Sequence, residues 1–406
     1  MKSHSFAPQR IAIVGTLAET MLGFRGELII DMVAAGHQVF AFATDFTEKT
    51  EQAVRNMGAT PVRYRMGRFS TNPLADLAST WQLYRLFKRH RITLTYCYFS
   101  KPAIYGTLAA WLAGVPTRVA KIEGLGRVFT TSPSGDSSRK QLIRRIMAQL
   151  FRISLPRAQH LFVLNQDDRD ELISMGITHP QPRVLGGIGV CLNRYSFQPP
   201  VQQPVRFVFI GRLLPEKGIR YFVEAAKNLR PRYPNAEFVI VGAPDRRKSG
   251  VNQQMLNNLM QQKVVTYAGL VKDVTPWLAQ SSVFVLPSYY REGVPRSTQE
   301  ALAMGRAVIT TDMPGCRETV IDDVNGYLVP PHDQQALEDA MVRLITQPEL
   351  LGPMGLASRQ LACEKFNVRQ INARILTLLE LAPQNAPQTD QPLVPASAAE
   401  AELGVI

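Results

Sequence analysis

The first half of the chain alternates short apolar runs with longer amphipathic stretches. Runs rich in valine, isoleucine and aromatic residues begin at Arg10, Gln38, Thr93, Thr117 and His160, for example RIAIVG, QVFAFAT and HLFVLN. Patterns of helical period, such as GFRGELIIDMVAAGH, separate these runs. Such an alternation predicts a parallel β-sheet whose strands are joined by crossover helices.

A stretch rich in proline and glutamine, SFQPPVQQPVRF, interrupts this pattern near Ser196 and is interpreted as a linker. A second alternation follows, with VRFVFIGR, AEFVIVG, VFVLPS and GYLVPP as its apolar runs. The predicted fold class is therefore α/β, with two Rossmann-like domains that we expect to face each other across a cleft. Ligands of such sheets bind beyond the carboxyl ends of the strands, so the cleft is the expected site.

Composition and targeting signals favour a cytoplasmic protein. The 406 residues, 45% of them hydrophobic, suit two globular domains. No stretch reaches the roughly 20 apolar residues of a membrane helix, and the N-terminal segment has no apolar signal region. The four cysteines are scattered, and the six histidines lack metal-ligand spacing. We therefore expect no disulfide framework and no metal site.

The formal net charge of +13 requires an explanation. An anionic membrane surface or a phosphate-bearing substrate could account for it, whereas nucleic acid is disfavoured because no recognition module is found. One basic helix is predicted over residues 138–153, with Leu142 and Ile146 on one face and Arg144, Arg145 and Arg152 on the other. Either it lies on a membrane surface, or its apolar face packs on the domain and its basic face is solvated.

Two cations flank the start of a predicted helix in GRLLPEKGIRYF. Arg212 follows a predicted strand, and Lys217 precedes the helix. Two positive charges beside the amides of a helix N-terminus suit an anion such as a diphosphate. The alternative is that both are ordinary solvated loop charges.

Two acids stand seven residues apart in PSYYREGVPRSTQEALAMG. Glu292 is predicted to lie in a loop after a strand, and Glu300 on the following helix, with Pro295 in its first turn and Gly305 at its end. The amides of Gly293, Val294 and Ser297 would then face the site. Carboxylates accept paired sugar hydroxyls well. The alternative is that Glu300 merely caps or solvates its own helix.

The ordered combination of these motifs resembles a known family. GRLLPEKG, then VFVLPSYYREGVPRSTQEALAMGRAVITTDMPGCRETVIDDVNGYLVPP, is similar to retaining glycosyltransferases of family GT4 with the GT-B fold. The similarity is greatest to the bacterial branch that builds capsule, O-antigen and lipopolysaccharide. In the first half GFRGELI, KPAIYGTLAAWLAGVP, GLGRVFT and NQDDRDELISMG occur in the expected order.

The resemblance implies that the two domains bind different substrates. Residues 1–196 would bind the acceptor, and residues 205–365 would bind a nucleotide-sugar. Residues 366–381 would form a helix that packs back toward the first domain. Residues 382–406 contain neither lysine nor arginine and little periodicity, so we expect a disordered tail.

Roles for individual residues follow from the same resemblance. Glu300 would bind the ribose hydroxyls, and Glu292 would contact hydroxyls of the donor sugar. Arg212 and Lys217 would hold the diphosphate, helped by the amides between Gly293 and Ser297. In the loop GLVKDV, the backbone of Val271 would lie against the base.

The first domain would contribute a wall near the phosphates, formed by Gly23, Phe24 and Arg25. Family members often carry a histidine that touches the donor sugar where this chain has Glu123, and this departure puts the identity of the sugar and the local charge in doubt. A second departure, Cys191 in place of a common aspartate, is expected to be structural only.

The resemblance therefore implies an enzyme that moves a hexose or N-acetylhexosamine from a nucleotide-sugar, UDP-linked, to a lipid-linked polyprenyl diphosphate saccharide. No metal and no other cofactor is expected, nucleic acid is not a partner, and the enzyme would work peripherally at the inner face of the plasma membrane. A sugar-nucleotide 2-epimerase on the same scaffold, or a non-catalytic sugar-nucleotide-binding protein, remains the alternative.

Overall fold

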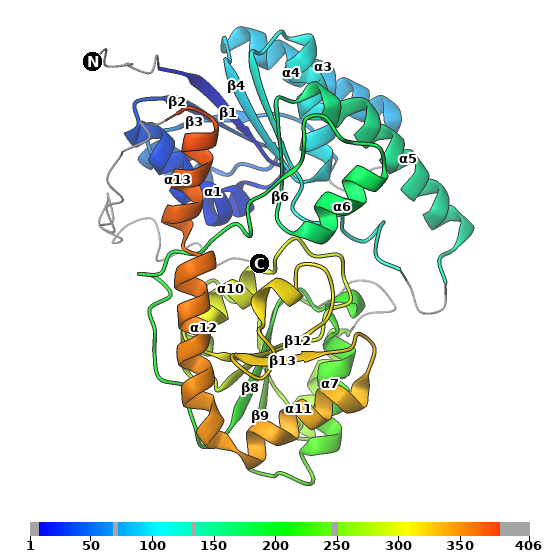
Figure 1. The fold of residues 1–406 in the computed structure, drawn as a ribbon, viewed down its shortest axis with the longest axis vertical. Coiled ribbons are helices and arrows are strands. Elements are labelled where there is room, and N and C mark those ends of the chain that lie inside the picture. The colour runs from blue at the N-terminus through cyan, green and yellow to red at the C-terminus, as the bar shows by residue number, and fades with distance from the viewer. Residues whose placement is uncertain (1–7, 68–71, 132–134, 245–250, 382–406) are drawn as a thin grey trace. The chain divides into compact units, whose positions relative to one another are not determined.

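The computed structural model describes residues 8–67, 72–131, 135–244 and 251–381, and these fold as two compact units (Figure 1). Unit 1 contains the described residues up to Leu185 and those from Arg369 onward, and unit 2 contains Gly186–Val368. The predicted boundary at residue 196 is therefore too late. Val190 pairs with Asn367 and exchanges backbone hydrogen bonds with both neighbours of that residue, so this segment belongs to unit 2.

Unit 1 is built on a seven-stranded parallel sheet in the order β3-β2-β1-β4-β5-β6-β7. Its strands are β1 (Arg10–Val14), β2 (Gln38–Ala43), β3 (Thr60–Arg63), β4 (Leu94–Tyr98), β5 (Thr117–Lys121), β6 (His160–Val163) and β7 (Arg183–Val184). Its helices are α1 (Ala18–Ala34), α2 (Glu48–Asn56), α3 (Pro73–Arg89), η1 (Pro102–Gly106), α4 (Thr107–Leu112), α5 (Ser138–Ser154), η2 (Leu155–Arg157) and α6 (Gln166–Ser174).

Unit 2 carries a six-stranded parallel sheet in the order β10-β9-β8-β11-β12-β13. Its strands are β8 (Arg206–Ile210), β9 (Glu237–Val241), β10 (Thr266–Gly269), β11 (Val283–Leu286), β12 (Ala307–Thr311) and β13 (Gly326–Val329). Its helical segments are η3 (Pro215–Lys217), α7 (Ile219–Leu229), α8 (Gln253–Gln261), α9 (Thr275–Ala279), α10 (Arg296–Ala303), η4 (Arg317–Thr319), α11 (Gln334–Thr346), η5 (Pro348–Leu350) and α12 (Leu351–Lys365).

Both sheets follow from the apolar runs of the sequence. Every residue of β4, β11 and β12 is buried, as expected for parallel strands covered on both faces. The predicted α/β class with two Rossmann-like units is confirmed.

The last described helix, α13 (Val368–Leu378), belongs to unit 1. Arg369 pairs with Glu27 at 2.8 Å and with Asp31 at 2.6 Å, both on α1. Asn372 donates a hydrogen bond to the same Asp31 carboxylate at 2.7 Å. These contacts hold α13 against α1, the helix that follows the first strand. The predicted tail, 382–406, lies outside the described residues.

No helix in the described part of the chain combines the length and the apolar character that crossing a bilayer demands.

Candidate functional site

The candidate site lies where the strand order of unit 2 reverses. β8 and β11 are neighbours in the sheet, but the chain runs outward from them in opposite directions, to β9 on one side and β12 on the other. Ligands of open α/β sheets bind beyond the carboxyl ends of strands at such a switch point. The loop after β8 carries Arg212 and Lys217, and the loop after β11 carries Glu292. Sequence reasoning had chosen these two loops.

Lys217 and Glu292 form an ion pair across the switch point. The Lys217 ammonium lies 2.5 Å from Oε1 of Glu292, and the two side chains are 14% and 10% exposed. Ser288 Oγ donates a hydrogen bond to the same carboxylate oxygen at 3.1 Å. The lysine also lies 5.9 Å from the centre of the Tyr290 ring. A carboxylate with these fixed neighbours is oriented before any ligand arrives.

Glycines allow the loops to approach one another this closely. Gly218 has φ of +80°, and a Cβ there would lie 1.9 Å from the carbonyl oxygen of Pro287. Gly315 has φ of +78°, and its Cβ would lie 2.2 Å from the carbonyl oxygen of Gly293. A side chain at either position would push the two loops apart, in addition to the strain of a left-handed backbone.

Glu300 is held by two side chains. Its Oε1 accepts a hydrogen bond from the hydroxyl of Tyr195 at 2.9 Å and one from Nε of Arg296 at 2.9 Å. Burial, and then the adjacent Glu300 carboxylate, raise the pKa of Tyr195, so the phenol keeps its proton and remains a donor. A carboxylate has about four acceptor positions, so these bonds still allow it to accept ligand hydroxyls.

The N-terminus of α10 lies between the two acids in sequence. Pro295 is the residue immediately before the helix, and Gly305, with φ of +79°, follows its end as predicted. The first amides of any helix have no acceptor within it, and they carry partial positive charge. The buried hydroxyl of Thr298, in the first turn, also has no partner among the described residues. This end of α10 is therefore suited to an anion.

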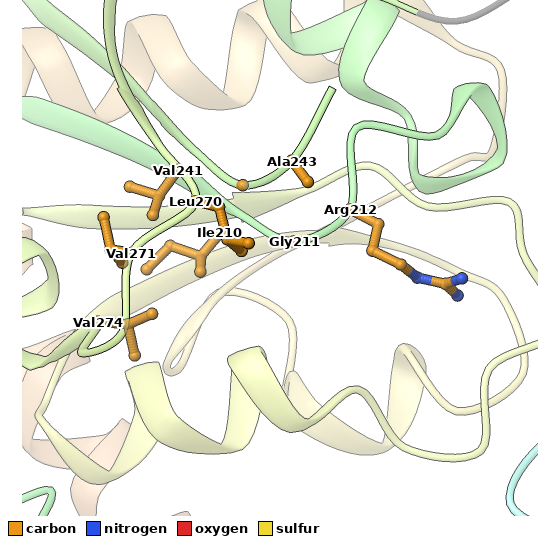
Figure 2. A pocket seen from close by; sticks show the side chains of 9 residues that line it. Ile210, Gly211, Arg212, Val241, Ala243, Leu270, Val271 and Val274 are labelled. Atoms are coloured by element: carbon orange, nitrogen blue, oxygen red, sulfur yellow. The ribbon is translucent and has the colours of Figure 1, made fainter. Parts of the chain in front are cut away.

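A small apolar pocket adjoins Arg212 (Figure 2). Val271 and Val274 line it from the loop after β10, and Ile210 and Val241 line it from the strand ends. Figure 2 shows the guanidinium of Arg212 extending away from these apolar side chains. These apolar side chains therefore lie beside a cation that can hold phosphate.

Two of the residues predicted in unit 1, Arg25 and Glu123, belong to a buried charge cluster. Arg25 lies on α1, within hydrogen-bond contact of Glu123. Lys121, at the end of β5, lies 3.1 Å from the same carboxylate oxygen, and the guanidinium of Arg25 stacks 4.5 Å from the ring centre of Tyr98. Burial, reinforced by the charge of Arg25, holds the pKa of Lys121 well below its usual value. The Glu123 carboxylate therefore lies between two buried basic side chains, which gives an acidic residue at this position a structural role.

Gly23 and Phe24 lie on α1, in the helical pattern predicted from the sequence, and both are partly buried.

Four residues that contact the predicted charged residues were not predicted from the sequence. Tyr195 and Arg296 orient Glu300, Ser288 bonds to Glu292, and Lys121 contacts Glu123. Arg296 could have been found, because it stands four residues before Glu300 on one helix face. The others come from segments with no local signal.

Two family models match the chain, one on each unit. The model described as "Glycosyl transferase 4-like domain" matches residues 26–186, and the model described as "Glycosyl transferases group 1" matches residues 204–347.

Two similar proteins are also named as glycosyltransferases. The chain is 25% identical, over 84% of its length and 90% of the relative, to the N,N'-diacetylbacillosaminyl-diphospho-undecaprenol alpha-1,3-N-acetylgalactosaminyltransferase of Campylobacter jejuni. It is 27% identical, over 73% of its length and 77% of the relative, to the UDP-Gal:alpha-D-GlcNAc-diphosphoundecaprenol alpha-1,3-galactosyltransferase of Escherichia coli.

Solved structures share the fold. Sucrose-phosphate synthase from Thermosynechococcus elongatus matches with a TM-score of 0.74 and 20% identity, covering 92% of this chain and 98% of that one. The Anabaena protein Alr3699/HepE in complex with UDP matches with a TM-score of 0.71 and 18% identity, covering 91% and 99%.

Proposed function

The chain belongs to the GT4 glycosyltransferases of the GT-B fold, and from that premise we propose that it moves a hexose or N-acetylhexosamine from a UDP-sugar to a lipid-linked saccharide. One observation carries the proposal: the loops after β8 and β11 at the switch point of unit 2 carry Arg212 and the Lys217–Glu292 ion pair, and α10, which bears Glu300, begins directly after the second loop. The comparisons give no support to the epimerase alternative.

Unit 2 would hold the donor. The diphosphate would lie between Arg212, Lys217 and the first amides of α10, where opposite charge and hydrogen-bond donors favour it. Glu300 would accept the ribose hydroxyls, and the pocket that includes Val271 would hold the base. UDP is favoured because a galactosyltransferase relative is named for UDP-Gal and a structural neighbour was solved with UDP.

The chemistry would depend on stabilising the leaving group. The bond between the anomeric carbon and the β-phosphate oxygen breaks, and negative charge grows on that oxygen beside Arg212 and Lys217. An electrostatic donor of this kind is typically worth about 3 kcal/mol of the barrier. Glu292, oriented by Ser288, would bind hydroxyls of the donor sugar.

Retention of the anomeric configuration would follow if the acceptor hydroxyl attacks from the same face, with its proton passing to the phosphate oxygen. No step requires a metal. The predicted contacts of Gly23, Arg25 and Glu123 with the donor remain predictions.

The acceptor would be a saccharide on polyprenyl diphosphate. The support is that both curated relatives are named for undecaprenyl-diphosphate-linked saccharides. An acceptor with such a tail resides in a membrane, so the enzyme would work at the inner face of the plasma membrane, in the synthesis of a surface polysaccharide.

Product analysis tests the proposal. The purified enzyme is incubated with a panel of UDP-sugars, with and without lipid-linked saccharide and with EDTA throughout. We expect sugar to appear on the lipid and UDP in solution only when both substrates are present. Conversion of a UDP-sugar without acceptor would indicate the epimerase, and binding of a UDP-sugar without turnover on any acceptor would indicate a non-catalytic protein.

A further inference from the structure

Helix α3 exposes an apolar stripe to solvent. Leu74, Leu77 and Trp81 recur at helical spacing on one face, and Leu74 and Trp81 are 76% and 59% exposed. The Trp81 indole stacks on Tyr84 with ring centres 4.9 Å apart, so it is held in place at the surface. Large apolar side chains gathered on one face of a helix are unusual in a surface that contacts water alone.

Two neighbouring elements continue this apolar surface. On α4, Trp111 is 46% exposed and Leu112 is also exposed, and the guanidinium of Arg157 lies 4.7 Å from the Trp111 ring centre. On α5, Leu142 and Ile146 are exposed. We call these outward faces of α3, α4 and α5 the apolar–basic surface.

The three helices lie beside one another on the same face of the unit 1 sheet. α3 packs against α4, and η1, which runs directly into α4, contacts both α3 and α5. The right-handed crossovers from β3 to β4, from β4 to β5 and from β5 to β6 all lead in the same direction across the sheet, which places their helices on one face. Figure 1 shows the three helices together.

Helix α5 differs from its prediction in which side chains face solvent. Its apolar residues do not share one buried face, because Leu142 and Ile146 point outward while Met147 packs against the core. Arg144 turns toward its own unit instead, where it pairs with Asp136 and donates a hydrogen bond to a backbone carbonyl at 3.0 Å. The outward face of α5 is therefore apolar and basic at once.

The exposed charges of this surface are all positive. α4 and α5, which the structure describes in full, contain no acidic residue, and Asp76 of α3 is buried and paired with Lys101 at 2.6 Å. The exposed cations are Arg85, Lys88 and Arg89 on α3 and Arg139, Arg145 and Arg152 on α5.

We propose that the apolar–basic surface docks on an anionic lipid bilayer, with Trp81 and Trp111 seated among the headgroups. Exposed tryptophans between apolar and cationic side chains match the chemistry of a membrane interface, where an indole has one apolar side and one wet side. A second copy of this chain would bring like charges together, so charge complementarity favours anionic lipid. The docking would give the proposed transferase access to its lipid-linked acceptor.

Tryptophan fluorescence tests the orientation, because the chain has only Trp81, Trp111 and Trp277. Trp277 lies on α9 of unit 2. In the variant Trp277→Phe, the fluorescence comes only from the two tryptophans of the proposed surface. In the double variant Trp81→Phe/Trp111→Phe, it comes only from the tryptophan of unit 2. With vesicles of phosphatidylglycerol and brominated phosphatidylcholine, we expect quenching and a blue shift in the first variant and no change in the second.

Charge reversal tests the electrostatic part. Each cation near an anionic surface contributes about 1 kcal/mol, so Arg139→Glu/Arg145→Glu should weaken vesicle binding about 30-fold or more. The matched control is Arg232→Glu/Lys263→Glu, which makes the same change in net charge at exposed positions of unit 2. We expect the control to bind within about threefold of the parent protein, because these charges are not part of the apolar–basic surface.

Several outcomes would overturn the inference. One is an absence of binding to vesicles with about 30% phosphatidylglycerol, on the order of natural anionic content. Another is an equal loss of vesicle binding in the Arg139→Glu/Arg145→Glu variant and its matched control. The others are lipid quenching of Trp277 fluorescence, and burial of Trp81 and Trp111 in a concentration-dependent dimer. Vesicle binding is measured without donor or acceptor, so its failure would leave the proposed sugar transfer intact. Transfer to a detergent-solubilised acceptor would fail only if the proposed function is wrong.

Discussion

Replacing Lys217 with alanine should affect catalysis and stability by separable amounts. The ammonium is a proposed stabiliser of the leaving diphosphate, and it also neutralises Glu292 at 2.5 Å. Loss of one such donor should lower kcat about 100- to 1,000-fold. Because the same ammonium forms this ion pair, the substitution should also lower the melting temperature.

The stability cost follows from the exposure of the pair. Breaking a fully buried ion pair costs about 3–5 kcal/mol, and a surface pair is worth about 0–1 kcal/mol. With side chains 14% and 10% exposed, Lys217→Ala should cost about 2 kcal/mol, since most but not all of the water is excluded. For a unit of this size, that loss lowers Tm by about 4–8 °C.

A double-mutant cycle separates the two effects. Lys217→Ala/Glu292→Gln removes both charges, so no unpaired carboxylate is left in the loop and most of the lost Tm should return, while transfer stays low. Lys227→Ala is the control, because its ion pair with Glu224 at 3.0 Å is well exposed and outside the site. Transfer at more than a tenth of the parent rate by Lys217→Ala, or an unchanged Tm, would refute the reasoning.

Two other predictions concern buried groups. Burial raises the pKa of the Cys97 and Cys316 thiols to about 12, so at pH 8 only about one in 10,000 of either is thiolate. Both thiols should therefore resist Ellman's reagent until the protein unfolds, and rapid modification of either would contradict this prediction. Glu123→Gln should destabilise unit 1 by about 3–5 kcal/mol, whereas Glu51→Gln, whose arginine partners are exposed, should change the stability little. The pKa of Lys121 is lowered on folding, so alkaline pH should recover part of the Glu123→Gln loss, as a series of melts from pH 7 to 10 would show.

Much of unit 2 could be predicted because its signals are local. The apolar run before Pro287, the turn residues around Gly293 and the glycine after α10 each fix a short piece of backbone. Since parallel strands end at the same edge, these pieces also indicate which loops meet. The acids and cations of the site could be chosen on that basis.

Contacts between distant segments could not be predicted. Tyr195 bonds to Glu300 across 105 residues, and the sequence assigned its segment to the first domain, just before the linker. The domain boundary was placed too late for the same reason, since Val190 pairs with a residue near the end of unit 2. In α5 the helical period is correct, but Leu142 and Arg144 exchange their expected environments because Asp136 supplies an inward partner for the arginine.

Titration of UDP into the protein by isothermal calorimetry, with Glu300→Gln as the comparison, tests the central claim most directly. The substitution keeps the shape of the side chain but replaces charge-assisted hydrogen bonds by weaker neutral ones. We predict one UDP site per chain in the parent protein and about tenfold weaker binding in the variant. Absence of UDP binding by the parent protein, or equal affinity in both, would contradict a nucleotide site at the switch point of unit 2.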